Sequence, residues 1–228
     1  MAVSPGAERS FREVVVRLGL NPDNQWVGGY VEYERTHFRR FLPSDLTGTT
    51  VLEFGCNMGA SAVIMAELGA SVVAIDVNSR YLEVARANAL RYGVNVEFLR
   101  VEDSSKLPFA NASFDWVNCN SVLEYLSRTV RTAVLNEIDR LLKPEGHILV
   151  TGTSNRLWPR EVHSRRWLVN YLPFGGYQRG VWPWELRRPK WRLEWLRSPL
   201  RPNLCLRVVK RAATRSNPSE LNTKAPRS

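Results

Sequence analysis

The chain alternates between two kinds of hydrophobic pattern over its first 150 residues. Apolar residues spaced three or four positions apart predict helices at 8–19, 24–42, 59–68, 79–92 and 128–142. Short apolar runs predict strands near 51–54, 71–75, 95–99, 114–117 and 147–150, and an alternating run predicts a last strand at 203–210. Because helices follow strands in turn, we expect one α/β domain with a doubly wound, mostly parallel sheet and right-handed crossovers.

The connection between the first two strands is the most informative part of this pattern. Residues 51–60 read VLEFGCNMGA, an apolar strand that runs into a glycine turn and then a helix, and the second strand ends in Asp76. Gly55 and Gly59 let the backbone turn sharply and approach a ligand, with no Cβ in the way. This arrangement is typical of sites for a nucleoside-bearing cofactor, although the Gly-x-x-x-Gly spacing disfavours a dinucleotide. The alternative is a glycine turn that serves packing alone.

Further motifs follow in order along the chain. Asp103 comes after the third strand, and residues 107–117 (LPFANASFDWV), 118–126 (NCNSVLEYL) and 141–150 (LLKPEGHILV) complete the series. In this order and spacing, the segment 48–152 resembles the class I S-adenosylmethionine (SAM)-dependent methyltransferases, in particular the group that modifies small molecules and lipids. The resemblance implies a Rossmann-like domain that binds SAM, yields S-adenosylhomocysteine (SAH) and uses no metal.

The resemblance also implies roles for individual residues. Glu53 would hold the ammonium group of the methionine part, and Asp76 would accept hydrogen bonds from the ribose hydroxyls. Asp103 would face the adenine amino group, while Asn120 and Ser121 would lie where the sulfonium meets the acceptor. The complete expected SAM site comprises Glu53, Gly55, Cys56, Asn57, Gly59, Asp76, Val77, Asp103, Ser104, Asn120 and Ser121.

An aromatic stripe lies in the predicted helix before the first strand. It includes Tyr30, Tyr33 and His37 at helical spacing, which packing alone also explains. In the family that the core resembles, helices in this place commonly fold over the cofactor and build part of the substrate pocket. These three residues are therefore candidates for a lid.

The last third of the chain carries the excess positive charge. Residues 151–228 hold 17 Lys and Arg against four Asp and Glu, whereas residues 1–150 hold 15 against 18, and six of the eight tryptophans lie in the last third. Three interpretations stay open: nucleic acid, an anionic membrane surface, and a solvated basic face over a Trp-lined pocket wall. Nucleic acid is disfavoured, because residues 118–121 lack the Asn/Asp-Pro-Pro-aromatic motif that grips a base in many such enzymes.

Methyl transfer depends mainly on alignment of donor and acceptor, which supplies about 7–11 kcal/mol. A hydroxyl acceptor also needs a base. His163, in the segment 155–163 (NRLWPREVH) after the fifth strand, is the first candidate, and an exposed loop histidine is the alternative. Glu124 is the second candidate for the base. Tyr125 follows it at a position where members of the family often carry histidine, which weakens the case for acid–base chemistry there.

The remaining composition narrows the class of protein. Three widely spaced cysteines indicate neither a disulfide framework nor a metal site, and no apolar run is long enough to span a membrane. We expect a cytoplasmic protein, with peripheral contact to an anionic membrane left open and the oligomeric state undetermined. The expected division is a helical cap at 1–47, a SAM-binding domain at 48–211 with its core at 48–152 and a substrate-side insertion at 153–201, and a disordered tail at 212–228.

The expected function is transfer of a methyl group from SAM to a small-molecule, saccharide or lipid-linked acceptor, with O-methylation favoured. The alternative is a non-catalytic module with the SAM-binding fold, which would attach to membranes or nucleic acid through its basic C-terminal segment.

Overall fold

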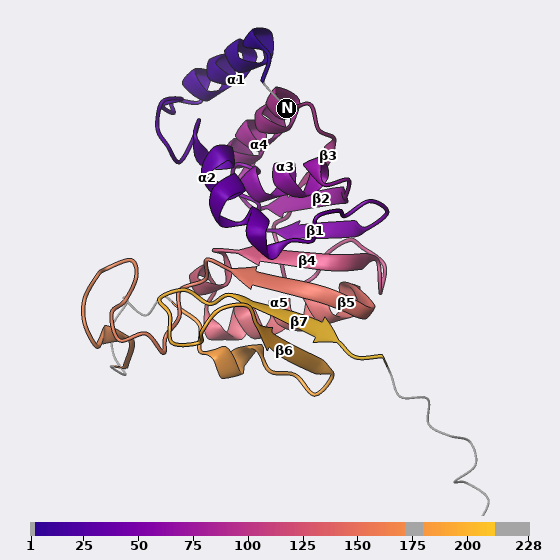
Figure 1. The fold of residues 1–228 in the computed structure, drawn as a ribbon, viewed down its shortest axis with the longest axis vertical. Coiled ribbons are helices and arrows are strands. Elements are labelled where there is room, and N and C mark those ends of the chain that lie inside the picture. The colour runs from indigo at the N-terminus through magenta and orange to yellow at the C-terminus, as the bar shows by residue number, and fades with distance from the viewer. Residues whose placement is uncertain (1–2, 172–179, 213–228) are drawn as a thin grey trace, which may run out of the picture.

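The computed structural model describes residues 3–171 and 180–212, which are built around one seven-stranded sheet (Figure 1). The strand order is β3-β2-β1-β4-β5-β7-β6, and β7 runs antiparallel to both of its neighbours. The strands are β1 (Thr50–Phe54), β2 (Ser71–Asp76), β3 (Val96–Arg100), β4 (Phe114–Asn120), β5 (Leu142–Thr151), β6 (Trp191–Trp195) and β7 (Leu206–Lys210). The chain reverses its direction of travel across the sheet between β1 and β4, which is where ligands bind in open α/β sheets. The predicted fold class is confirmed.

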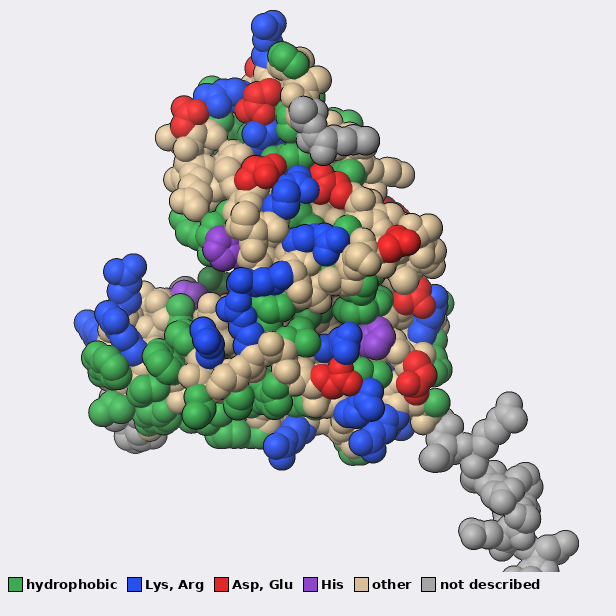
Figure 2. Space-filling model, in the orientation of Figure 1, with side chains coloured by type: hydrophobic (Ala, Val, Ile, Leu, Met, Phe, Trp, Pro, Cys, Tyr) green, Lys and Arg blue, Asp and Glu red, His purple; other side chains and the backbone are tan. Residues whose placement is uncertain are grey.

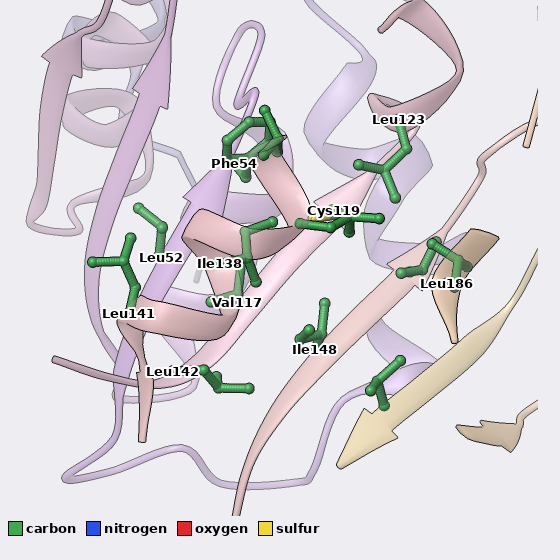
Figure 3. Packing of buried hydrophobic residues seen from close by; sticks show 14 of the residues in the cluster. Leu52, Phe54, Val117, Cys119, Leu123, Ile138, Leu141, Leu142, Ile148 and Leu186 are labelled. Carbon is green, nitrogen blue, oxygen red and sulfur yellow. The ribbon is translucent and has the colours of Figure 1, made fainter. Parts of the chain in front are cut away.

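Helices cover both faces of the sheet. One face is covered by α3 (Ala60–Glu67) and α4 (Ser79–Tyr92), and the other by α5 (Arg128–Leu141). Because successive strand residues point to opposite faces, the mostly apolar strands supply both layers of the core at once. Figure 3 shows the layer under α5, where strand side chains meet the helix: Leu52, Phe54, Val117, Ile138 and Leu141.

Local chemistry fixes the predicted bounds of α4. The Asn78 side chain accepts hydrogen bonds from the backbone N–H groups of Arg80 and Tyr81, which caps the helix start. Gly93 ends the helix in the left-handed conformation, with φ of 66°. Both signals are visible in the sequence, and the expected range of 79–92 is the observed one.

The N-terminal segment contains α1 (Pro5–Arg17), α2 (Tyr30–His37) and the 3₁₀ turn η1 (Arg39–Phe41). The single helix expected over 24–42 is wrong. The chain approaches itself too closely at Gly28, where an added Cβ would lie 1.8 Å from the carbonyl oxygen of Pro22. The aromatic spacing therefore continues through a turn, and the helix begins only at Tyr30.

Ion pairs dock these N-terminal helices on the core. Arg91 of α4 donates to the Glu8 carboxylate of α1 at 2.6 Å and to the Gly28 carbonyl at 2.8 Å. Arg35 of α2 pairs with Glu67 of α3. These contacts place α2 against the core, and its Tyr30 and Glu34 reach the ends of the parallel strands.

The segment after β5 projects beyond the carboxyl ends of the parallel strands (Figure 1). It includes the short turns η3 (Val169–Tyr171) and η4 (Pro183–Leu186), and it returns through β6, a strand that the sequence pattern did not indicate. A buried ion pair of 2.8 Å between Arg131 and Glu185 joins η4 to α5. The expected disordered tail at 212–228 lies outside the described residues except for Ala212, whose backbone N–H donates to the Glu145 carboxylate at 2.7 Å. Among the helices of residues 3–171 and 180–212, none has the length and apolar content needed to cross a bilayer.

Candidate functional site

A cavity of about 720 Å³ opens at the carboxyl ends of β1, β2 and β4. Its walls come from the turn after β1, the end of β2, the residues that follow β3 and β4, and α2. The expected site residues that line it are Tyr30, Glu53, Gly55, Cys56, Asn57, Asp76, Val77, Ser104, Asn120 and Ser121.

The glycine turn shapes the floor of this cavity. Gly55 has φ of 72°, and an added Cβ would lie 2.4 Å from a methyl carbon of Val122. The backbone N–H groups of Gly55 and Cys56 both donate to the Ile75 carbonyl at 2.9 Å. Asn57 also has a left-handed backbone, with φ of 49°. The turn thus requires a residue without a Cβ at position 55 and one tolerant of positive φ at position 57.

Asp76 is tied to the turn from the end of β2. Its Oδ2 accepts from the Asn57 backbone N–H at 2.8 Å, and its Oδ1 accepts from the Asn78 backbone N–H at 2.9 Å. A carboxylate has about four acceptor positions, so two remain for a ligand in the cavity that Asp76 lines.

Glu53 is a buried acid with no cationic partner among the described residues. Its side chain is 1% exposed and accepts a hydrogen bond of 2.6 Å from the Asn118 amide. Burial raises the pKa of Glu53 to about 8, against the opposing effect of the Asn118 hydrogen bond, and the nearby Glu34 charge adds to the rise. Such a group at a cavity wall is suited to a ligand that brings a positive charge.

Two expected site residues lie outside the cavity lining. The Asp103 carboxylate bonds the backbone N–H and hydroxyl of Ser105, at 2.8 and 2.5 Å, and its neighbour Ser104 lines the cavity instead. Gly59 caps the start of α3 with φ of 80°, and an added Cβ there would lie 2.9 Å from the Cβ of Ala85. Gly59 therefore permits close packing of α3 on α4.

A second cavity of about 420 Å³ adjoins the first. The two share four lining residues, Trp26, Tyr30, Asn120 and Ser121. The Asn120 amide nitrogen donates to Glu34 at 3.2 Å and to Ser61 at 3.1 Å, and its oxygen accepts from Thr151 at 3.0 Å. Asn120 is thus held rigidly at the junction.

Gly152 keeps the junction open. It lines the second cavity with φ of 64°, and an added Cβ would lie 2.1 Å from the Ser121 hydroxyl oxygen. Any side chain at this position would press on Asn120 and Ser121, two of the four residues that line both cavities.

Glu34 is a site residue that the sequence analysis did not single out. It lies on α2, is 7% exposed, and lines the second cavity. Burial raises its pKa, which the Asn120 hydrogen bond and the His37 charge oppose. A charged residue within an aromatic helical stripe reads as a solvated position, and only the docking of α2 turns it inward.

The expected lid residues divide between the two cavities. Tyr30 lines both, whereas Tyr33 and His37 line the second. The Tyr33 and His37 rings stack at a centroid distance of 4.1 Å, and the Trp26 ring meets Tyr33 edge-on at 4.9 Å. Trp26 belongs to the same predicted aromatic stripe but was not singled out as a site residue, because packing alone explains such a position.

The two candidate catalytic residues line neither cavity. Glu124 is 4% exposed in the 3₁₀ turn η2 (Leu123–Tyr125), and burial raises its pKa to about 7. His163 is exposed, with its ring 5.7 Å from the ring of Tyr125, which lines the first cavity. His163 therefore lies at the rim, one side chain away from the site.

Metal ligation has no support in the described ranges 3–171 and 180–212. Within them, no group of three or more His, Cys, Asp or Glu side chains is placed to hold an ion. The three cysteines are buried and unpaired with one another.

Comparisons with known proteins agree with this geometry. A family model described as a methyltransferase domain matches residues 51–146. The ubiquinone biosynthesis O-methyltransferase of Xanthomonas oryzae pv. oryzae (strain PXO99A) is 36% identical over 135 residues, which cover 58% of this chain and 55% of that protein. The protein of the same name from Pectobacterium atrosepticum is 30% identical over 148 residues, covering 63% and 60%. The chain thus spans little more than half the length of these curated relatives.

Solved structures share the fold. A SAM-dependent methyltransferase from Aquifex aeolicus superposes with a TM-score of 0.56 at 20% identity, covering 77% of this chain and 87% of that one. One from Methanosarcina mazei gives 0.51 at 21% identity, covering 76% and 94%. Fold and site define a Rossmann-like nucleoside-binding domain. Residues 51–146 therefore match a methyltransferase domain, and the fold around them is shared with solved SAM-dependent methyltransferases.

The first cavity fits SAM, the methyl donor of this class. The buried carboxyl group of Glu53 has no cationic partner in the described part of the chain, which suits an ammonium group. Asp76 retains free acceptor positions, which suit a pair of hydroxyls. Gly55 leaves the turn open beside them.

Proposed function

We propose that the protein transfers a methyl group from SAM to an oxygen atom of a small acceptor. The observation that carries this proposal is the pair of adjoining cavities that meet at Asn120 and Ser121. The first has the residues that suit SAM, and the second offers a separate space of about 420 Å³ for an acceptor. The similarity to proteins named O-methyltransferases supports oxygen as the methylated atom.

The first cavity would hold the donor through three groups. Glu53 would bind the ammonium group, Asp76 the ribose hydroxyls, and the Ser104 segment the edge of the adenine. When bound, SAM supplies a methyl group on a sulfonium that is open to in-line attack. Asn120 and Ser121 would set the approach of the acceptor, and alignment of this kind supplies most of the rate enhancement.

Removal of the acceptor proton is the step that requires a base. Glu34 faces the second cavity from the junction, and its raised pKa makes it a stronger base than an ordinary carboxylate. His163 could serve only through a shift of the rim, since it lines neither cavity. Glu34 is therefore the base that we propose.

Methyl transfer by three single variants tests this assignment. With methyl-labelled SAM and a panel of hydroxylated small molecules, Glu34→Gln should lower kcat by about 100-fold or more, since a positioned base contributes that much. His163→Ala should leave kcat unchanged. Glu32→Gln is the matched control, on the same helix but exposed and paired with Arg35 at 3.2 Å. A large loss in His163→Ala with normal turnover in Glu34→Gln would assign the base to His163.

A second proposal is peripheral contact with an anionic membrane. Trp167, Leu168, Tyr171 and Trp184 of the C-terminal segment are each at least 47% exposed. Figure 2 shows apolar side chains gathered at the lower left, over this segment, with basic side chains beside them. Exposed arginines on the same segment include Arg160, Arg165, Arg166 and Arg187. Aromatic and basic side chains together favour the headgroup region of an anionic bilayer.

A further inference from the structure

The second cavity differs from the first in the charge of its walls. Three arginines line it, Arg40 from η1, and Arg197 and Arg201 from the chain between β6 and β7. In Figure 2, basic side chains gather across the middle of the face, where the N-terminal and C-terminal segments meet. These arginines come from opposite ends of the sequence and converge on one space of about 420 Å³.

These three guanidinium groups have no carboxylate partner among the described residues. Within residues 3–171 and 180–212, none of the three makes a salt bridge, whereas Arg35, Arg131 and Arg207 each pair with a glutamate at the core or the sheet edge. Arg40 and Arg197 instead lie over the same ring, with their central carbons 5.0 and 5.2 Å from the centroid of Phe41.

The positive charges of Arg40 and Arg197 are close enough to act on the same buried side chain, that of Cys205. Burial raises the pKa of the Cys205 thiol to about 11, and the positive charges of Arg197 and Arg40 oppose that rise. Gathering like charges without a counterion is unfavourable, and a bound anion removes the cost. A guanidinium also matches the geometry of a carboxylate or phosphate better than any other side chain.

The acidic residue of the second cavity, Glu34, lies beside Asn120, where the two cavities meet. Glu34 accepts a hydrogen bond from Asn120 at the junction, and its raised pKa makes it a stronger base than an ordinary carboxylate. A ligand in this space would therefore meet a proton acceptor at the junction and positive charge in the part lined by the arginines.

We infer that the acceptor carries an anionic group, a carboxylate or a phosphate, that binds Arg40, Arg197 and Arg201 while its hydroxyl lies at Asn120. The inference rests on the proposed function, and it adds the chemical class of the acceptor. Neutral and cationic acceptors of the same size would leave the three arginines uncompensated.

Calorimetry with matched probes tests the inference. 3,4-Dihydroxybenzoate, its neutral methyl ester and phenyl phosphate are each titrated into the protein, with and without SAH. The acid or the phosphate should bind at least about tenfold more tightly than the ester, because hydrogen bonds to charged groups are worth that much. Which of the two anions binds distinguishes a carboxylate acceptor from a phosphorylated one.

Variants locate the binding. The double substitution Arg197→Gln with Arg201→Gln should reduce anion affinity at least about tenfold while SAH affinity changes less than about twofold. Arg192→Gln is the control, an exposed arginine paired with Glu194 at 2.8 Å on β6. Equal affinity for acid and ester, failure of both anions to bind, or unchanged anion binding in the double variant would overturn the inference. If the wild type did not bind SAH at all, the proposed function would be contradicted instead. Titration of the probes without SAH keeps these two failures distinguishable.

Discussion

At the scale of single residues, the buried acids define the chemistry of the site. Glu34, Glu53 and Glu124 each have a pKa raised chiefly by burial. Of these residues, Glu53 lines the first cavity and Glu34 lines the second. A fold that buries a carboxyl group without a cation loses stability in the free state, and a ligand with a positive charge restores it.

Binding of SAH should therefore depend on pH through Glu53. Free Glu53 has a pKa of about 8, and an ammonium ligand favours its ionised form, so a proton must leave on binding at lower pH. We expect affinity to rise by about tenfold per pH unit between pH 6 and 8 and then to level off. Calorimetry in buffers of that range measures the slope.

Substitutions isolate the source of that slope. Glu53→Gln should bind SAH weakly with no dependence on pH, while Glu124→Gln, with a similarly raised pKa but outside the cavity, should keep the slope. The unfolded carboxyl ionises near 4.5, whereas the folded one keeps its proton up to about 8. Wild-type stability should thus fall as pH rises across that window, and Glu53→Gln should remove part of the fall. If SAH affinity depended on pH in Glu53→Gln as it does in the wild type, Glu53 would not be the source of that dependence.

Sequence analysis named half of the residues that line the first cavity and fewer of those that line the second. Gly55 directly follows β1 and Asp76 is the last residue of β2, so the ends of two paired strands bring them together. Glu34 and Arg197 meet only through tertiary docking, which no local spacing records. Asp103 was expected at the adenine by resemblance, and its carboxylate instead bonds Ser105 in a local turn.

At the scale of elements, the C-terminal segment carries most of what the sequence did not predict. The strand β6 was missed although its sequence alternates, because it is only five residues long and lies within a segment dense in Arg, Trp and Pro. The helix over 24–42 was wrong for the opposite reason, a regular aromatic spacing across a tight turn at Gly28. Periodicity reports which side chains could share a face, and it does not report where the backbone crosses itself.

The proposed membrane contact belongs to this same segment. We expect the protein to float with vesicles that contain phosphatidylglycerol and not with pure phosphatidylcholine, with binding that weakens as salt rises. The double substitution Trp167→Ser with Leu168→Ser should lower the bound fraction severalfold, since both side chains are more than half exposed.

A matched control separates the surface patch from general hydrophobicity. Leu90 of α4 is 77% exposed on another element, and Leu90→Ser should float as the wild type does. Recovery of all protein in the pellet or soluble fraction with anionic vesicles would refute membrane contact.

At the scale of the whole molecule, distant parts of the chain complete one site. The core supplies most of the first cavity, the N-terminal segment supplies Trp26, Tyr30, Glu34 and Arg40, and the chain before β7 supplies Arg197 and Arg201. The sequence predicted the parallel core because each strand and helix there has its own local signal. The second cavity forms where the N-terminal and C-terminal segments dock on the core. The ion pairs of Arg35 with Glu67 and of Arg131 with Glu185 hold these segments in place.

The central claim is that the first cavity binds the donor between Glu53 and Asp76. Calorimetric titration of SAH into wild type, Asp76→Ala and Asp23→Ala tests it most directly, where Asp23 is an exposed aspartate paired with Arg12 at 2.7 Å. We predict binding to the wild type and to Asp23→Ala, and an affinity at least about tenfold lower in a folded Asp76→Ala, as expected for loss of charge-assisted hydrogen bonds. No binding of SAH to the wild type, or equal binding by Asp76→Ala, would contradict the claim.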